Sequence, residues 1–264
     1  MPATASGPVS SPEPPSPAAG APRTPSQVDR GTVHHPELRA GRWSVAGISK
    51  VDHDVSVGRA DLRGTVVIGG DLRAGEVDAH GRLEVRGAVA VTSRLRLRGS
   101  LAVRAGVRAA ELSLAGSVEV AGTLASERTL RVEGVLRGAA LRSPMLELRG
   151  VADVPGATEA TSLDGRFTGD THLGEVRART VRLRGPVPNL VRWVLGRQAS
   201  VIVDRIEAES VYLEGVRVAF ARAREIVLGR DAHLLAHEGR VLRAHSTSRL
   251  GPESWTPAPP GFRR

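Results

Sequence analysis

Apolar residues alternate with polar ones along most of the chain, and the alternation repeats in short units. Each unit consists of an aliphatic residue, any residue, a second aliphatic residue, any residue and a glycine. The units are Leu83-Val85-Gly87, Leu95-Leu97-Gly99, Leu112-Leu114-Gly116, Leu130-Val132-Gly134, Leu146-Leu148-Gly150, Val181-Leu183-Gly185 and Val211-Leu213-Gly215. A period of two places alternate side chains on opposite faces of a β-strand, so these units predict strands with one face inward.

The spacing of the units predicts how the strands are connected. Successive glycines from Gly99 to Gly150 are 17, 18 and 16 residues apart. Between them, Gly, Ala or Ser occupies the inward phase roughly every six residues, where a small side chain lets a strand bend without losing its phase. Three such sides make a coil of roughly 17 to 18 residues, which is typical of a parallel β-helix. The sequence therefore predicts an all-β solenoid of about 11 coils between residues 45 and 243.

Proline marks the expected ends of this domain. Nine of the 17 prolines lie in the first 36 residues and four lie in the last 13. Segments rich in Pro, Ala, Ser and Gly bury too little apolar surface to offset the entropy of ordering them. We therefore expect disordered tails at residues 1–42 and 246–264 around a β-helix domain at residues 43–245. A short helix is expected as an insertion at residues 188–198, between an asparagine cap and a glycine.

Composition narrows the chemistry. The chain has no cysteine, so disulfides and thiolate catalysis are excluded, and it has no stretch near the roughly 20 apolar residues of a membrane span. Its N-terminus lacks the basic start and apolar run of a signal peptide, so a cytoplasmic location is expected. The 37 basic residues outnumber the 28 acidic ones, and Lys50 is the only lysine. A GC-rich genome explains this arginine bias as readily as selection for nucleic-acid binding does.

No motif in the sequence predicts a catalytic, cofactor-binding or metal-binding residue. There is no phosphate-binding loop, no dinucleotide fingerprint and no nucleophile elbow. His233 and His237 are four residues apart, but no carboxylate nearby completes a metal site. The Asp52-His53-Asp54 run is interpreted as polar surface, because alternation points His53 away from both acids.

Arginine forms the one surface pattern that suggests a ligand. Five arginines share the outward phase and are expected to form a positive strip able to meet phosphates or anionic headgroups: Arg94, Arg96, Arg98, Arg104 and Arg108. The favoured interpretation is instead that outward arginines neutralise glutamates on neighbouring coils: Glu84, Glu119, Glu133 and Glu147.

With these repeats in view, the chain resembles the bactofilins, polymer-forming bacterial cytoskeletal proteins. Residues 83–150 match their pattern of short aliphatic strands with Gly, Val and Ala steps. A more specific match is the acidic strand at residues 206–215, followed by a closing aliphatic-Gly coil at residues 223–229 and preceded by the insertion. The resemblance implies a single-stranded right-handed parallel β-helix. The chain is longer than is common in that family and has an irregular stretch at residues 154–170, so polymerisation stays open.

The resemblance also implies a function. We expect a nucleotide-independent scaffold without cofactor or enzymatic activity, which assembles end to end and recruits protein partners through its tails, at the envelope or the chromosome. Peripheral membrane contact is compatible with it, and nucleic acid is not the expected partner. The expected polymer contact is the layer of apolar residues in the closing repeats: Val216, Val218, Phe220, Ile226 and Leu228.

Two other interpretations stay open. One is a hexapeptide-repeat acyltransferase with His80 or His172 as general base, although the glycines close an alternating pair here rather than mark a strict hexad. The other is a binding module for anionic polymers that uses the arginine strip.

Overall fold

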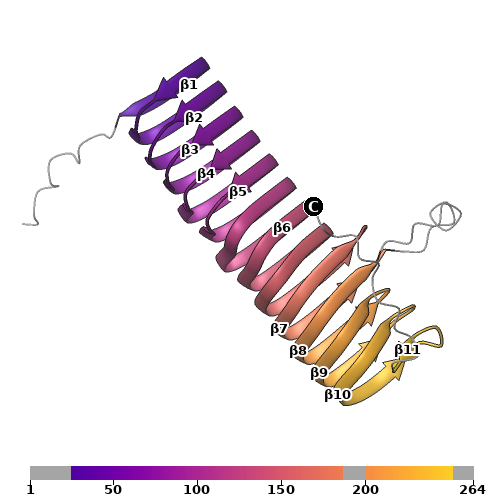
Figure 1. Ribbon diagram of the computed structural model, residues 1–264. Helices are drawn as coiled ribbons and strands as arrows, with labels where there is room; N and C mark the ends of the chain where they lie inside the picture. Colours follow the sequence, from indigo (N-terminus) through magenta and orange to yellow (C-terminus); the bar gives the residue numbers. More distant parts are fainter. Residues whose placement is uncertain (1–24, 187–199, 252–264) are drawn as a thin grey trace, which may run out of the picture.

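The computed structural model describes residues 25–186 and 200–251, and these residues wind into one solenoid (Figure 1). All strands belong to a single parallel sheet, in which β1 to β11 follow one another in chain order. The chain makes about 12 turns, and the described residues contain no helix. The predicted all-β parallel solenoid is confirmed.

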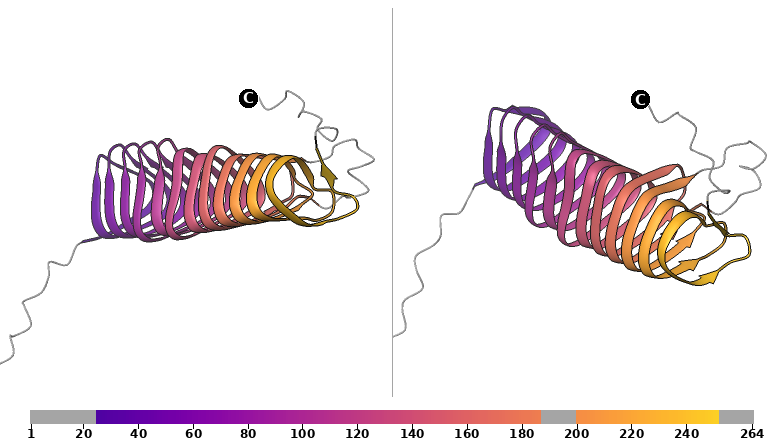
Figure 2. Two further views of the ribbon diagram at one scale, coloured as in Figure 1. Left: turned by 90° about the horizontal axis from the view of Figure 1, so that it is seen from below. Right: turned by 60° about the horizontal axis from the view of Figure 1, so that its bottom comes forward.

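Most strands span one coil of the solenoid. They are β1 (Ser26–His35), β2 (Leu38–Val51), β3 (Val55–Ile68), β4 (Leu72–Val85), β5 (Val89–Val103), β6 (Val107–Phe167), β7 (Thr171–Arg184), β8 (Val201–Glu214), β9 (Arg217–Leu228), β10 (His233–Ala244) and β11 (Arg249–Leu250). β6 is longest because its backbone stays extended around several turns. Figure 2 shows the successive turns stacked along one axis.

The core consists of apolar side chains stacked in columns along that axis. Val45, Leu62, Ala79, Leu97 and Leu114 are paired through five consecutive coils and form one such column. None of them is more than 3% exposed. Each aliphatic side chain contacts the equivalent residues above and below it, and its burial stabilises the fold by about 1.5–3 kcal/mol. Each turn has three sides, and on each side two buried residues are separated by one that points outward. This arrangement produces the alternation of apolar and polar residues in the sequence.

A second column consists of glycines at one corner of the solenoid. Its members are Gly31, Gly47, Gly64, Gly81, Gly99, Gly116, Gly134 and Gly150, which all have positive φ angles. A Cβ at Gly116 would lie 2.0 Å from the carbonyl oxygen of Gly99. A Cβ at any of the other six glycines from Gly47 to Gly150 would lie 2.0–2.3 Å from the carbonyl oxygen of the glycine in the preceding coil. Both the backbone angle and the contact with the preceding coil thus require glycine.

This corner differs from the sequence-based expectation. Gly116 was expected to share the inward phase with its aliphatic neighbours, but it lies exposed at the corner while Leu114 and Val118 point inward. The chain turns by adopting a φ of 123° at Gly116. Backbone conformation, rather than a small inward side chain, makes the bend.

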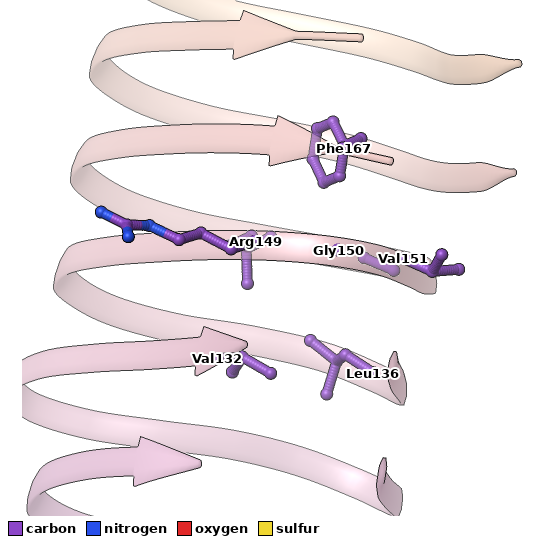
Figure 3. A pocket seen from close by; sticks show the side chains of 8 residues that line it. Val132, Leu136, Arg149, Gly150, Val151 and Phe167 are labelled. Atoms are coloured by element: carbon purple, nitrogen blue, oxygen red, sulfur yellow. The ribbon is translucent and has the colours of Figure 1, made fainter. Parts of the chain in front are cut away.

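The glycine column ends where Phe167 enters the core. Figure 3 shows Phe167 above Gly150 and Val151, with Val132 and Leu136 below them. The phenyl ring is only 3% exposed, and the space around it has no room for a water molecule. The expected irregular stretch at residues 154–170 is therefore mostly part of β6, with one register shift after Val154.

The domain boundaries differ from those expected. β1 and the first residues of β2 lie within residues 26–42, where a disordered tail was expected. The inward positions of β1 include Gln27, Asp29 and His35. Because these residues are polar, β1 lacks the alternation of apolar and polar residues that predicts a strand. At the other end, β11 extends the solenoid beyond residue 245. The expected helix at residues 188–198 and the outer parts of both tails lie outside the described residues.

The glycine column gives a direct test of the fold. We expect Gly116→Ala to lower the free energy of unfolding by about 2–5 kcal/mol, because the new Cβ meets the Gly99 carbonyl and the backbone angle disfavours any side chain. Gly138→Ala is the matched control, since its nearest neighbour, the Val120 carbonyl oxygen, lies 3.8 Å away. Urea unfolding followed by circular dichroism compares the two, and equal midpoints would contradict the described corner.

Candidate functional site

Within the described residues, the two ends of the solenoid are the places where its sheet has an unpaired edge, and they are built differently. In this part of the chain β1 pairs with β2 alone, and β10 pairs with β9 along its length but with β11 only at His233 and Leu234. An unpaired strand edge is a ready template for another chain. The ends are therefore the candidate functional surfaces of this rod.

A buried carboxylate organises the N-terminal end. Asp29 is 2% exposed, and its Oδ2 accepts hydrogen bonds from Trp43 Nε1 at 3.0 Å and from Ser49 Oγ at 2.9 Å. The same oxygen lies 2.9 Å from His35 Nε2, and Oδ1 accepts from Gln27 Nε2 at 2.8 Å. Trp43 and Ser49 belong to β2 and are fully buried. The cluster therefore joins the first coil to the second.

These donors keep Asp29 ionised. Burial by itself raises the pKa of the carboxyl, but the hydrogen bonds from Gln27, Trp43, His35 and Ser49 together outweigh it and hold the pKa below its ordinary value of 3.8. The end of the apolar core thus carries an ionised carboxylate whose two oxygens are hydrogen-bonded within the molecule.

The C-terminal end has a different character. On the side away from β9, residues 236–244 have no strand beside them within the described part of the chain. Two large apolar side chains are exposed here, Leu242 at 48% and Leu250 at 47%. Register shifts after Glu238 and Val241 also make β10 less regular than the coils before it. This end combines an open backbone edge with exposed apolar surface.

The residues expected to form the polymer contact do not lie on that end surface. Val216, Val218, Ile226 and Leu228 are at most 1% exposed, and β10 covers their coil, with Leu234 on Val218 and Val241 on Ile226. The last regular apolar layer thus lies one coil before the end of the solenoid, because β10 has few inward apolar residues.

Phe220 faces sideways instead. It is partly exposed on the flank of β9, and the Arg205 guanidinium lies over its ring, 5.2 Å from the centroid. This is the geometry of a cation–π contact between neighbouring coils. Phe220 therefore belongs to the side of the rod, and the residues that sequence reasoning missed at the end are Leu242 and Leu250.

The five arginines of the expected strip are not brought together. Arg94, Arg96 and Arg98 lie along one side of β5, Arg104 follows the end of β5, and Arg108 lies on the next side, in β6. Arg94 pairs with Glu111 at 2.9 Å and Arg108 with Glu127 at 3.1 Å. The turns of the coil separate residues that share one phase in the sequence.

Charge is instead arranged as a ladder along another side. Six outward residues on consecutive coils alternate in sign: Arg142, Glu159, Arg177, Glu207, Arg222 and Glu238. Arg177 Nε lies 3.8 Å from Glu207, whose pKa is lowered by its hydrogen bond from Arg205 and by the charges around it. Opposite charges on adjacent strands favour the observed register. Arginines thus pair with glutamates on neighbouring coils, as expected, although most of the residues in this ladder are not the expected ones. Of the expected glutamates, Glu147 pairs with Arg131 on the preceding coil at 2.9 Å.

The histidines considered for catalysis lie on separate flanks. His80 Nδ1 is 3.5 Å from Asp78 on β4, and His172 Nε2 is 3.1 Å from Asp204 on β8. Among the described residues no group of three His, Cys, Asp or Glu side chains could hold a metal ion. Asp52 pairs with His34 and Lys50, and His53 is exposed, so this run lies on the surface.

Comparison with known proteins adds no further constraint. Neither family models, nor curated proteins, nor solved structures include a match to this chain. Within residues 25–186 and 200–251 there is also no helix that is long and apolar enough to cross a membrane.

The Asp29 cluster predicts a pH dependence of stability. Since the folded pKa lies below the unfolded one, the ionised carboxylate stabilises the fold fully above about pH 4, and this contribution is lost as the pH falls through the folded pKa. Asp29→Asn should lower the free energy of unfolding by about 1–3 kcal/mol at neutral pH. The difference from the wild type should shrink in acid.

Urea unfolding between about pH 7 and pH 2.5 measures this difference, with hydrogen exchange in residues 26–51 as a local readout. Asp78→Asn, on the partly exposed flank of β4, is the control. A penalty at Asp29 that is independent of pH would contradict the ionised state assigned to it.

Proposed function

We propose that the protein is a non-enzymatic structural scaffold whose rods join end to end through the C-terminal edge. The observation that carries this proposal is the open edge of β10, at residues 236–244, beside the exposed Leu242 and Leu250. Pairing this edge with a second chain satisfies its backbone groups and removes apolar surface from water. The resemblance to bactofilins supports the same proposal.

A second copy of the chain is the proposed occupant of this edge. Two identical edges related by a two-fold axis pair antiparallel. β10 carries Glu238 on one side of Gly239 and both Arg240 and Arg243 on the other. Antiparallel pairing therefore brings the acidic residue of each copy near a basic residue of the other, which stabilises opposed strands. The edge is complementary to itself in charge as well as in hydrogen bonding.

The rest of the proposal concerns how the scaffold is used. The columnar core and the charge ladder make a stiff rod in which each coil supports the next. The sequence carries no nucleotide-binding motif, so assembly should not require ATP or GTP. Protein partners would attach through the Pro-rich terminal segments, a class of sequence that often carries recognition motifs.

The joint is tested by charging its apolar residues. Leu242→Lys with Leu250→Lys should weaken self-association at least about tenfold, because each apolar side chain buried in a joint contributes about 1.5–3 kcal/mol. Met145→Lys is the matched control, since Met145 is 54% exposed but lies on the flank in β6. Sedimentation over a range of concentrations, with and without ATP or GTP, measures the effect.

Three results would count against the joint. They are a wild type that stays monomeric at every concentration, a double variant that associates normally, and assembly that depends on nucleotide. A chain ending at residue 251 tests the alternative occupant. If association appears only after residues 252–264 are removed, that segment covers the edge and the rods do not join through it in the full chain.

A further inference from the structure

The first coil changes the chemistry of the core columns. Asp29 occupies the same column as Val45 and Leu62, and His35 the same column as Val51. Gln27 lies above the fully buried Trp43. These three positions are polar in β1 and apolar in the coils that follow, and in β2 the buried Ser49 precedes Val66 in a further column. The apolar stack therefore ends in a polar layer at this end.

Both oxygens of the Asp29 carboxylate in this layer are hydrogen-bonded. The four donors to Asp29 come from both coils, two from β1 and two from β2. The Trp43 indole lies in the coil directly beneath, with no exposed surface. In the described chain the outer edge of β1 has no strand beside it, and Val28 in β1 is 59% exposed. A second rod approaching this end nevertheless meets a polar layer, and not an apolar one, at the end of the core columns.

Stacking a second rod on this layer is unfavourable. An apolar layer placed on it would further desolvate the Asp29 carboxylate and the partly exposed Gln27 and His35 without supplying new donors. Two such ends placed together would bring two Asp29 charges face to face across the joint. Neither arrangement buries an apolar side chain in these columns of the first coil, because Gln27, Asp29 and His35 occupy them.

We propose that the Asp29 cluster is an end cap that prevents self-association at the N-terminal end. Rods that join through their C-terminal edges then form closed two-fold pairs rather than filaments. The pairing rests on the proposed function, whereas the cap stands independently of it. The proposal concerns β1 with Trp43 and Ser49 from β2.

An apolar replacement of the layer tests the cap. The apolar-cap variant carries Gln27→Val, Asp29→Val, His35→Val, Trp43→Leu and Ser49→Ala. Removing donors together with the acceptor avoids leaving buried polar groups unpaired. We expect the wild-type full-length chain to form pairs and the variant to form longer rods that grow with concentration, as seen by sedimentation and negative-stain microscopy.

The control places similar apolar side chains on the flank of the same strand. Its substitutions are at exposed positions: Ser26→Val, Arg30→Val and Thr32→Val. This variant should remain the size of the wild type. Circular dichroism melting checks that each variant is folded. If the apolar-cap variant does not fold, Gln27→Val with His35→Val, which keeps the Trp43 and Ser49 bonds to Asp29, should still show growth at high concentration.

The outcomes separate the cap from the joint. Wild-type filaments, or a folded apolar-cap variant of wild-type size, would overturn the cap. A wild type that is monomeric would overturn the C-terminal joint. In that case the cap still requires the apolar-cap variant to associate, now through its N-terminal end.

Discussion

Parallel hydrogen bonding between successive coils is the constraint on which the rest of this structure depends. Because each coil pairs in register with the one before it, equivalent positions stack into columns and share the same surroundings. Residues of one column are therefore of similar type. The aliphatic columns make the core and the alternating charges make the ladder on the flank. From Gly47 to Gly150 one corner accepts only glycine, because a Cβ at a position such as Gly116 would collide with the carbonyl oxygen of the preceding coil.

The same constraint makes the ends of the rod its distinctive surfaces. Every coil inside a column contacts a coil on each side, but a terminal coil has a neighbour on one side only. The residues of the terminal coils therefore differ from those of the repeats. At the N-terminal end Asp29, with Trp43 and Ser49 beneath it, closes the core with a polar layer. At the C-terminal end residues 236–244 leave backbone and apolar groups without a neighbouring strand in the described chain. The asymmetry between these ends gives the rod its proposed assembly behaviour.

Much of the solenoid could be predicted from the sequence because its central coils are regular. The repeats from Leu83 to Gly150 contain both the two-residue alternation and the coil length, and the structure has both. The mechanism of the corner could not be predicted, because alternation cannot distinguish an inward glycine from a corner glycine with positive φ.

The ends were harder to predict because they depart from the repeat. Asp29 and His35 interrupt the apolar pattern in β1, so a coil was taken for a tail. Asp29 lies 16 residues before Val45, which equals the shortest spacing between the successive glycines, and this spacing was the available signal for a core column. Phe220 was expected at the end of the rod but lies on its flank. Alternation in the sequence indicates which face of a strand a residue is on, but not where that strand lies along the axis of the solenoid. Which coil is last depends on pairing that no local pattern contains.

The central claim is that the two ends behave differently toward a second copy. The chain has no cysteine, so one can be introduced at a single chosen place for a spin label. Labels at Arg243 in β10 and at Arg30 in β1 report on the two ends, and electron paramagnetic resonance measures distances between labels on associated chains. We expect a defined short distance for the Arg243 label and none for the Arg30 label. A short distance between Arg30 labels, or between Arg30 and Arg243 labels in mixed samples, would contradict the account.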